Sequence, residues 1–141
     1  MAESSYDKFL PPDDLPEFHR PFWDSVKAHQ VRLQRCSSCG RFRYIPSEIC
    51  PGCGSLSADW TPISGRGVVY TYTIVHRAPT EAYQRDAPYP IVHVTLDEGP
   101  RMIAGLVGVP IDEVAVGLPV HLIYDDVTPD VTIFNFARWE E

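Results

Sequence analysis

The placement of the cysteines constrains the fold of this chain more than any other feature. All four lie in two short segments, Cys36-Ser-Ser-Cys39-Gly40 and Cys50-Pro51-Gly52-Cys53-Gly54. Each segment is a C-x-x-C knuckle closed by glycine, a spacing at which two thiolates can hold one ion. Four thiolates suit a tetrahedral Zn²⁺ site and leave no coordination position for a substrate water. The spacing therefore predicts a structural metal site made by Cys36, Cys39, Cys50 and Cys53.

Zinc is the predicted ion, and iron is the alternative. The two knuckles also resemble those of rubredoxin, and tetrahedral thiolate sites accept either metal. No motif for a second redox cofactor is found in the sequence, which favours zinc. Disulfides are disfavoured because the sequence does not open with a charged and then apolar signal segment.

Hydropathy and charge limit the classes of protein to which this chain can belong. The longest apolar run, residues 102–111, is interrupted by Gly105, Gly108 and Pro110, so we expect a cytoplasmic protein that does not enter the membrane. The 14 prolines among 141 residues disfavour long helices and predict short strands joined by turns. The formal net charge of −7 provides no long-range attraction to polyphosphate, and we expect no nucleic-acid partner.

Four arginines lie around the first knuckle without an intervening acid: Arg32, Arg35, Arg41 and Arg43. One interpretation is charge compensation, because Zn²⁺ bound by four thiolates carries two net negative charges. The other is a landing point for phosphates or for an acidic partner, which guanidinium groups pair with well. The sequence favours the first interpretation and leaves the second open.

Three regions follow from the pattern along the chain. Residues 1–17 are polar and proline-containing and predict a flexible tail. Residues 18–62 predict a short helix followed by the metal ribbon, which is too small to fold without its metal. The helix carries Phe18, Phe22 and Val26 at four-residue spacing, with Pro21 suited to its first turn. Core packing is the default role of its aromatic residues, and partner docking through Phe18, Phe22 and Trp23 is the second.

Residues 63–141 change to a period of two, typical of strands. Strands are predicted at 68–75, 91–97, 101–107, 119–124 and 131–137, with a hairpin turn at 97–100 and a helical turn at 110–114. Five short antiparallel strands with one helical crossing after the third match a small Greek-key barrel of the OB type. The predicted fold is therefore mainly β: an N-terminal helix and Cys₄ zinc ribbon followed by a five-stranded OB-fold barrel.

No catalytic group stands out. Every cysteine is assigned to the metal, and the sequence has no G-x-S-x-G, H-E-x-x-H or glycine-rich phosphate motif. The loop at 77–90 bears aromatic residues and arginines where OB barrels meet ligands, namely Arg77, Tyr83, Arg85 and Tyr89. An equal alternative is a solvent loop stiffened by proline.

The order of these parts resembles a family of small acyl-CoA-associated proteins that join a rubredoxin-like zinc ribbon to a C-terminal OB fold. The matching residues include Leu33-Gln34-Arg35-Cys36-x-x-Cys39-Gly40, Cys50-Pro51-x-Cys53, Gly65-x-Gly67-Val68-Val69-Tyr70-Thr71 and Leu96-Asp97-Glu98-Gly99. The match spans about residues 18–137. The knuckles alone are common, whereas the knuckles followed by the two later motifs are fairly specific.

The resemblance implies an accessory subunit that is not catalytic alone. Such proteins pair with thiolase-fold enzymes, among them thiolases, acyltransferases, hydroxymethylglutaryl-CoA synthase assemblies and steroid side-chain aldolases. The implied complex is a hetero-oligomer, an acyl-CoA lyase or acyltransferase, in which the small subunit docks on the catalytic one and shapes the acyl-CoA channel. Arg77, Tyr83, Arg85 and Tyr89 are the expected channel contacts. The alternatives are a single-stranded nucleic-acid-binding module, disfavoured by the net charge, and an iron electron carrier.

Overall fold

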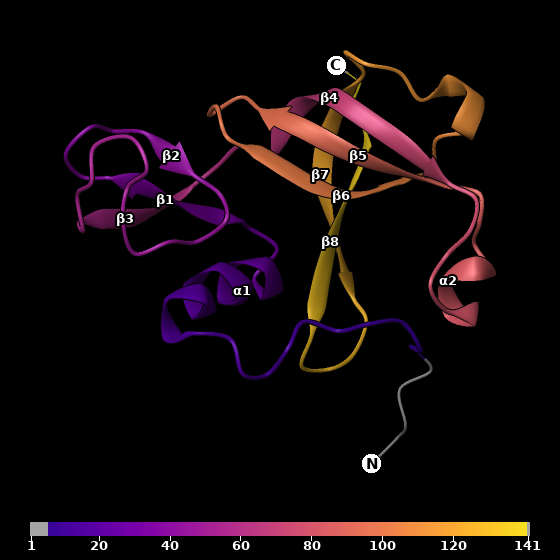
Figure 1. The fold of residues 1–141 in the computed structure, drawn as a ribbon, viewed down its shortest axis with the longest axis horizontal. Helices are drawn as coiled ribbons and strands as arrows, with labels where there is room; N and C mark the ends of the chain where they lie inside the picture. Colours follow the sequence, from indigo (N-terminus) through magenta and orange to yellow (C-terminus); the bar gives the residue numbers. More distant parts are fainter. Residues whose placement is uncertain (1–5, 141) are drawn as a thin grey trace.

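The computed structural model describes residues 6–140 and shows two small β structures side by side, with one helix packed below the first of them (Figure 1). The chain enters through η1 (Glu17–His19) and α1 (Arg20–Lys27), makes a three-stranded sheet, and then closes a barrel. Among the described residues, no helix is both long and apolar enough to span a membrane.

The first sheet contains β1 (Arg32–Cys36), β2 (Phe42–Arg43) and β3 (Ala58–Pro62) in the order β2-β1-β3. Both neighbours of β1 are antiparallel to it. The first knuckle is the turn between β1 and β2, and the second lies in the connection from β2 to β3. The sheet is small, and Cys36, the first cysteine of the first knuckle, is the last residue of β1.

The barrel contains β4 (Arg66–Val75), β5 (Tyr89–Leu96), β6 (Arg101–Val107), β7 (Pro119–Asp126) and β8 (Thr132–Arg138). It closes in the order β4-β5-β6-β8-β7, with β7 paired back to β4. The pairs are antiparallel except β6 with β8, which is parallel. This is the OB topology, and the prediction of an OB-type barrel is confirmed. The expectation of antiparallel strands fails only for the β6–β8 pair, because η2 (Ile111–Glu113) and β7 lie between the two along the chain.

The predicted strand positions agree with the structure because their residues alternate inward and outward. In β5 half-buried and buried residues alternate along the whole strand, and the buried ones are Pro90, Val92, Val94 and Leu96. Position 67 has no space for a side chain, because Thr95 and Val94 lie against Gly67. A Cβ added at Gly67 would lie 2.4 Å from the Thr95 carbonyl oxygen. The predicted turn at 97–100 is also present, closed by the Gly99 N–H donating to the Leu96 carbonyl at 2.9 Å.

One hydrophobic core is continuous through the ribbon, α1 and the barrel. Phe22, 1% exposed, sits at the junction: its ring centroid lies 5.6 Å from that of Tyr44 in the ribbon and 5.8 Å from that of Phe134 in β8. Polar contacts reinforce the junction, since the Val31 N–H donates to the Tyr124 hydroxyl at 3.1 Å. The two β structures are therefore packed on a shared core. The domain boundaries predicted from the sequence stay a prediction.

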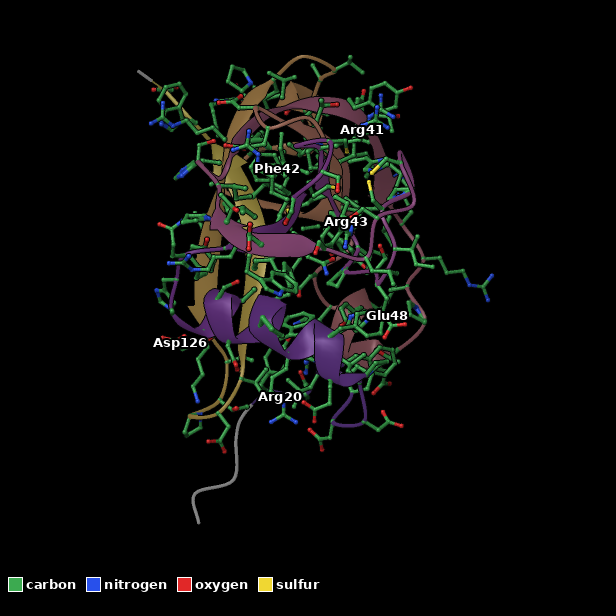
Figure 2. All side chains as sticks on the ribbon, turned by 90° about the vertical axis from the view of Figure 1, so that its left-hand side faces the viewer. Arg20, Arg41, Phe42, Arg43, Glu48 and Asp126 are labelled. Atoms are coloured by element: carbon green, nitrogen blue, oxygen red, sulfur yellow. The ribbon has the colours of Figure 1, made fainter. Side chains whose placement is uncertain are left out.

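A surface hydrogen bond links the segment just after α1 to the barrel. His29 Nε2 lies 2.9 Å from Asp126 Oδ1, and the His29 ring stacks on Tyr124 with centroids 5.1 Å apart. Figure 2 places Asp126 beside the end of α1. Thr132 donates its hydroxyl proton to the same carboxylate. His29, followed by the Thr132 hydroxyl, lowers the pKa of Asp126.

We expect Asp126→Asn to lower the melting temperature slightly at pH 7 and to have no effect in strong acid. A carboxyl with a lowered folded pKa stabilises the fold above its ordinary pKa, and that contribution is lost as the pH falls through the folded pKa. Thermal melts of both proteins across the acid range measure this. Asp125→Asn is the matched control. A melting difference that stayed undiminished in strong acid would contradict the assignment.

Candidate functional site

The four cysteine sulfurs form one cluster. All Sγ atoms lie within 4.8 Å of one another, with Cys36 Sγ 3.5 Å from Cys53 Sγ and Cys39 Sγ 3.7 Å from Cys50 Sγ. The thiols are free rather than joined as disulfides. The first cysteine of each knuckle is buried and the second is exposed, so the cluster lies at the surface of the ribbon. In Figure 2 sulfur atoms, drawn in yellow, lie close to Arg41.

The two knuckles share one backbone geometry. The Gly40 N–H donates to the Cys36 carbonyl at 2.9 Å, and the Gly54 N–H donates to the Cys50 carbonyl at 2.8 Å. Gly40 and Gly54 have φ angles of 76° and 79°, in the left-handed region that glycine adopts without strain. The closing glycine of each C-x-x-C-G segment is thus required by the turn.

Backbone N–H groups of the knuckles also change the pKa values of the cysteine thiols. The Cys39 N–H, 3.4 Å from Cys36 Sγ, is the main cause that lowers the pKa of Cys36 to about 6. The backbone N–H groups of Cys53 and Gly52 lower the pKa of Cys50 in the same way. The Ser55 N–H pulls the pKa of Cys53 down, but the neighbouring thiols, Cys36 first among them, outweigh it and raise that pKa to about 11. Metal loading near neutral pH must therefore displace protons from the cluster, including that of Cys53.

The cluster fits a tetrahedral metal ion. A tetrahedron with metal–sulfur bonds of about 2.3 Å has sulfur–sulfur edges of about 3.8 Å. The two sulfur pairs at 3.5 and 3.7 Å lie close to that length. The donor set suits zinc or iron equally. With all four positions filled by cysteine, the ion would hold the ribbon together rather than bind a substrate.

Two of the four arginines cover the knuckles. Arg35 Nε donates to the Gly40 carbonyl at 3.1 Å. The Arg41 guanidinium lies on the second knuckle, where Nη1 would be 2.5 Å from a Cβ added at Gly52. This placement of positive charge beside both cysteine pairs favours charge compensation of a thiolate cluster.

Arg43 has a different role, because it is buried and holds the loop between the knuckles. Its Nε donates to Gln34 Oε1 at 3.2 Å and its Nη2 to the Ser47 carbonyl at 2.9 Å. Its Nη1 is buried without a hydrogen-bond partner in the described part of the chain. Arg32 is exposed on β1. Because Arg43 is buried, it does not contribute to an exposed anion-binding surface with Arg35 and Arg41.

The 77–90 loop contains a short helix, α2 (Glu81–Gln84), which the sequence did not indicate. Arg77 is exposed. Arg85 is paired with Asp7 of the N-terminal segment, an ion pair that raises the pKa of Arg85. The Tyr83 hydroxyl accepts a hydrogen bond from the Phe9 N–H at 3.2 Å. Two of the expected channel residues therefore contact residues of the predicted tail; whether that tail is flexible stays a prediction.

The aromatic residues of the predicted docking set separate into two groups. Phe22 faces the core and has almost no surface to present to a partner. Phe18 and Trp23 are half-buried. Trp23 also lines a cavity that includes Tyr83 and Tyr89, so three residues singled out from distant parts of the sequence meet there. The contact between the N-terminal segment and α2 was missed; the only sequence signal was the inverted charge order of Asp7-Lys8 and Arg85-Asp86.

The fold and the cysteine cluster define a protein of the zinc-ribbon and OB-fold class, and two family models agree. The model described as ChsH2, rubredoxin-like zinc ribbon domain, matches residues 23–57, and that described as ChsH2, C-terminal OB-fold domain, matches residues 60–124. The chain belongs to the ChsH2 family.

Curated relatives fall into two kinds. A probable enoyl-CoA hydratase alpha subunit of Thermomonospora curvata is 35% identical over 79% of this chain and 35% of its own length. A 3-oxo-4,17-pregnadiene-20-carboxyl-CoA hydratase alpha subunit of Mycobacterium tuberculosis is 38% identical over 84% of this chain and 36% of its own. This chain thus spans about a third of either hydratase subunit. A DUF35 domain-containing scaffold protein of Methanocaldococcus jannaschii is 34% identical over 77% of both chains.

Solved structures of similar chains confirm the architecture. A chain of the Ltp2-ChsH2(DUF35) aldolase superimposes with a TM-score of 0.80 at 31% identity, covering 90% of this chain and 98% of that one. A DUF35-family protein of unknown function from Sulfolobus solfataricus superimposes with a TM-score of 0.65 at 16% identity, covering 90% and 89%, and shares the fold.

Proposed function

We propose that this chain is an accessory, non-nucleophilic subunit of a thiolase-fold complex that forms or cleaves a carbon–carbon bond in an acyl-CoA. One observation carries the proposal: the chain matches almost the full length of a ChsH2(DUF35) chain named as part of an aldolase. It also matches about a third of two hydratase alpha subunits. We favour an aldolase-type assembly because the structure that this chain superimposes on along nearly the whole of that chain is named as an aldolase.

The cysteine cluster favours a structural rather than a catalytic role for this chain. All four thiols of the chain gather around one point, so none is left to act as a nucleophile or as a base on an acyl thioester. The residues that make or break the carbon–carbon bond would belong to the partner subunit. This chain would supply a rigid docking body whose ribbon and barrel share one core.

Zinc is the proposed ion of the cluster. The sulfur separations and the guanidinium groups at both knuckles support a divalent ion held by four thiolates. The role we assign is structural: the ion keeps β1, β2 and the second knuckle together, and with them the ribbon side of the core.

The docking surface is proposed to include Phe18 and Trp23 on the α1 side, and the channel contact to include Arg77, Tyr83, Arg85 and Tyr89. Trp, Tyr and Arg are the residue types most often found at the energetic centre of interfaces. Arg85 could contact a CoA phosphate only after releasing Asp7, so we expect such a contact to compete with the N-terminal segment.

Co-purification from a native lysate tests the proposal. The tagged chain is expected to bring down a thiolase-like subunit in stoichiometric amount, identified by mass spectrometry. Trp23→Ala should weaken the binding of that subunit about thirtyfold, the effect of losing a hot-spot residue of about 2 kcal/mol. Trp139→Ala, which removes an indole after β8, is the matched control. Recovery of the chain alone, or with nucleic acid, would overturn the accessory role.

A further inference from the structure

An apolar cavity of about 550 Å³ lies between the N-terminal segment and the outside of the barrel. Its floor is made by the outer faces of β5, β6 and β8, and one of its walls by residues 6–11, named here the strap. Trp23 of α1 and Tyr83 of α2 also line it. Figure 1 shows the strap running from near α2 towards α1, past the end of the β7–β8 hairpin.

The floor is more apolar than an outer barrel surface needs to be. Ile91 from β5, Ile103 and Val107 from β6, and Ile133 from β8 all line it. Ile103 is 56% exposed and Val107 48% exposed even with the strap in place. Gly105 lies between them in β6, and the Asn135 amide fills the space beside it, where an added Cβ would lie 2.9 Å from Asn135 Oδ1. Contiguous exposed apolar surface of this kind marks a binding site more often than a structural need.

Residues 7–9 of the strap make polar contacts to the α2 region. Asp7 pairs with Arg85, Lys8 Nζ lies 2.9 Å from Asp86 Oδ2, and the Phe9 N–H donates to the Tyr83 hydroxyl. The Phe9 and Tyr83 rings also contact each other, with centroids 5.6 Å apart. Exposed ion pairs of this kind contribute little to stability. These contacts therefore fix the α2 end of the strap only weakly.

The charges at the rim define the chemistry of the occupant. Asp7 of the strap is paired with Arg85, and Lys8 of the strap is paired with Asp86. These four residues therefore present no unbalanced charge to a ligand. The volume falls within the range of about 300–1,000 Å³ typical of small-molecule sites. A partner helix is about 10–12 Å across with its side chains and would displace the strap, whereas a small hydrocarbon fits beneath it.

We propose that this cavity binds an uncharged, predominantly hydrocarbon group and that the strap closes over it. The site itself is independent of the accessory role; only the source of the ligand, the acyl part of a CoA thioester, rests on the proposed function. The cavity would then hold the part of the substrate that is remote from the reacting thioester.

Binding of N-phenyl-1-naphthylamine, an uncharged fluorescent probe, tests the site on the full, metal-loaded chain. We expect saturable binding with one probe per chain. Ile103→Arg places a charge on the floor and should raise the dissociation constant at least tenfold. Val68→Arg is the control, because Val68 is 44% exposed on β4 and does not line the cavity. Val107→Arg is the second test variant should Ile103→Arg fail to fold, as judged by circular dichroism and metal content.

Two uncharged competitors separate the classes of hydrocarbon. Displacement of the probe by dodecanol indicates a linear chain, and displacement by a neutral steroid dione indicates fused rings; either supports the cavity. Non-saturable binding, equal affinity in both floor variants and in Val68→Arg, or displacement by neither competitor would overturn it. Co-purification with the floor variants keeps the two proposals distinct, because loss of probe binding should leave partner recovery unchanged.

Discussion

Replacing Cys36 by serine is expected to release the metal and to unfold β1, β2 and β3 while the barrel stays folded. Cys36 is 2% exposed and is the last residue of the central strand of the ribbon sheet. In small zinc domains metal binding supplies an apparent free energy of about 10–16 kcal/mol, and such domains do not fold without it. The ribbon has one two-residue strand and two of five residues, too little structure to persist alone.

Chelator competition and hydrogen exchange measure this effect. The wild-type chain should release one ion, and elemental analysis then identifies it; a visible absorption band that bleaches on reduction would contradict zinc and indicate iron. In the variant, amide protection should disappear from residues 32–62 and remain in β4 to β8. Ser38→Ala, an exposed change within the same knuckle, is the control. Full metal retention by Cys36→Ser would contradict a four-cysteine site.

Replacing Phe22 by alanine is expected to destabilise the whole chain by about 3–5 kcal/mol, the usual cost of removing a fully buried aromatic ring. Phe22 is 1% exposed, and its ring contacts Trp23, Tyr44 and Phe134, which belong to the helix, the ribbon and the barrel. Its loss should therefore uncouple the two β structures as well as lower stability. Urea unfolding of the metal-loaded chain measures the free energy of unfolding.

Phe18→Ala is the matched control for that experiment. Phe18 is half-buried and contacts the neighbouring His19 ring, so its removal should cost much less stability than removal of Phe22. If the docking proposal is right, Phe18→Ala should instead weaken partner recovery. Equal destabilisation by both changes would contradict the assignment of Phe22 as the junction residue.

The fold was predictable where the pattern is local. The barrel strands follow from alternation, as in Val92, Val94 and Leu96 of β5, and the knuckles from cysteine spacing. Two elements gave no local signal. The strand β3, Ala58–Pro62, has little strand propensity and forms because β1 offers it a partner. The helix α2 has four residues and lies in a segment that reads as a proline-rich loop.

The candidate site was predictable in part for the same reason. Spacing brings the four cysteines together without any knowledge of the remaining chain. Four-residue spacing places Phe18 and Phe22 on one helix face, but spacing alone does not say which of the two is buried, and the structure shows that it is Phe22. The strap contacts join residues 74 to 78 apart in the sequence, as in Phe9 with Tyr83 and Asp7 with Arg85, and only tertiary structure brings them together.

The strand order of the ribbon sheet indicates which part of this protein is most prone to aggregation. A closed barrel presents no free strand edge, whereas β3 pairs with β1 on one side only. Unpaired edges are templates for pairing with other chains, and charged residues and proline are the usual protection. Asp59 and Pro62 lie on this edge strand. Loss of the metal would free β1 as well, so a depleted preparation should precipitate through its ribbon while its barrel remains intact.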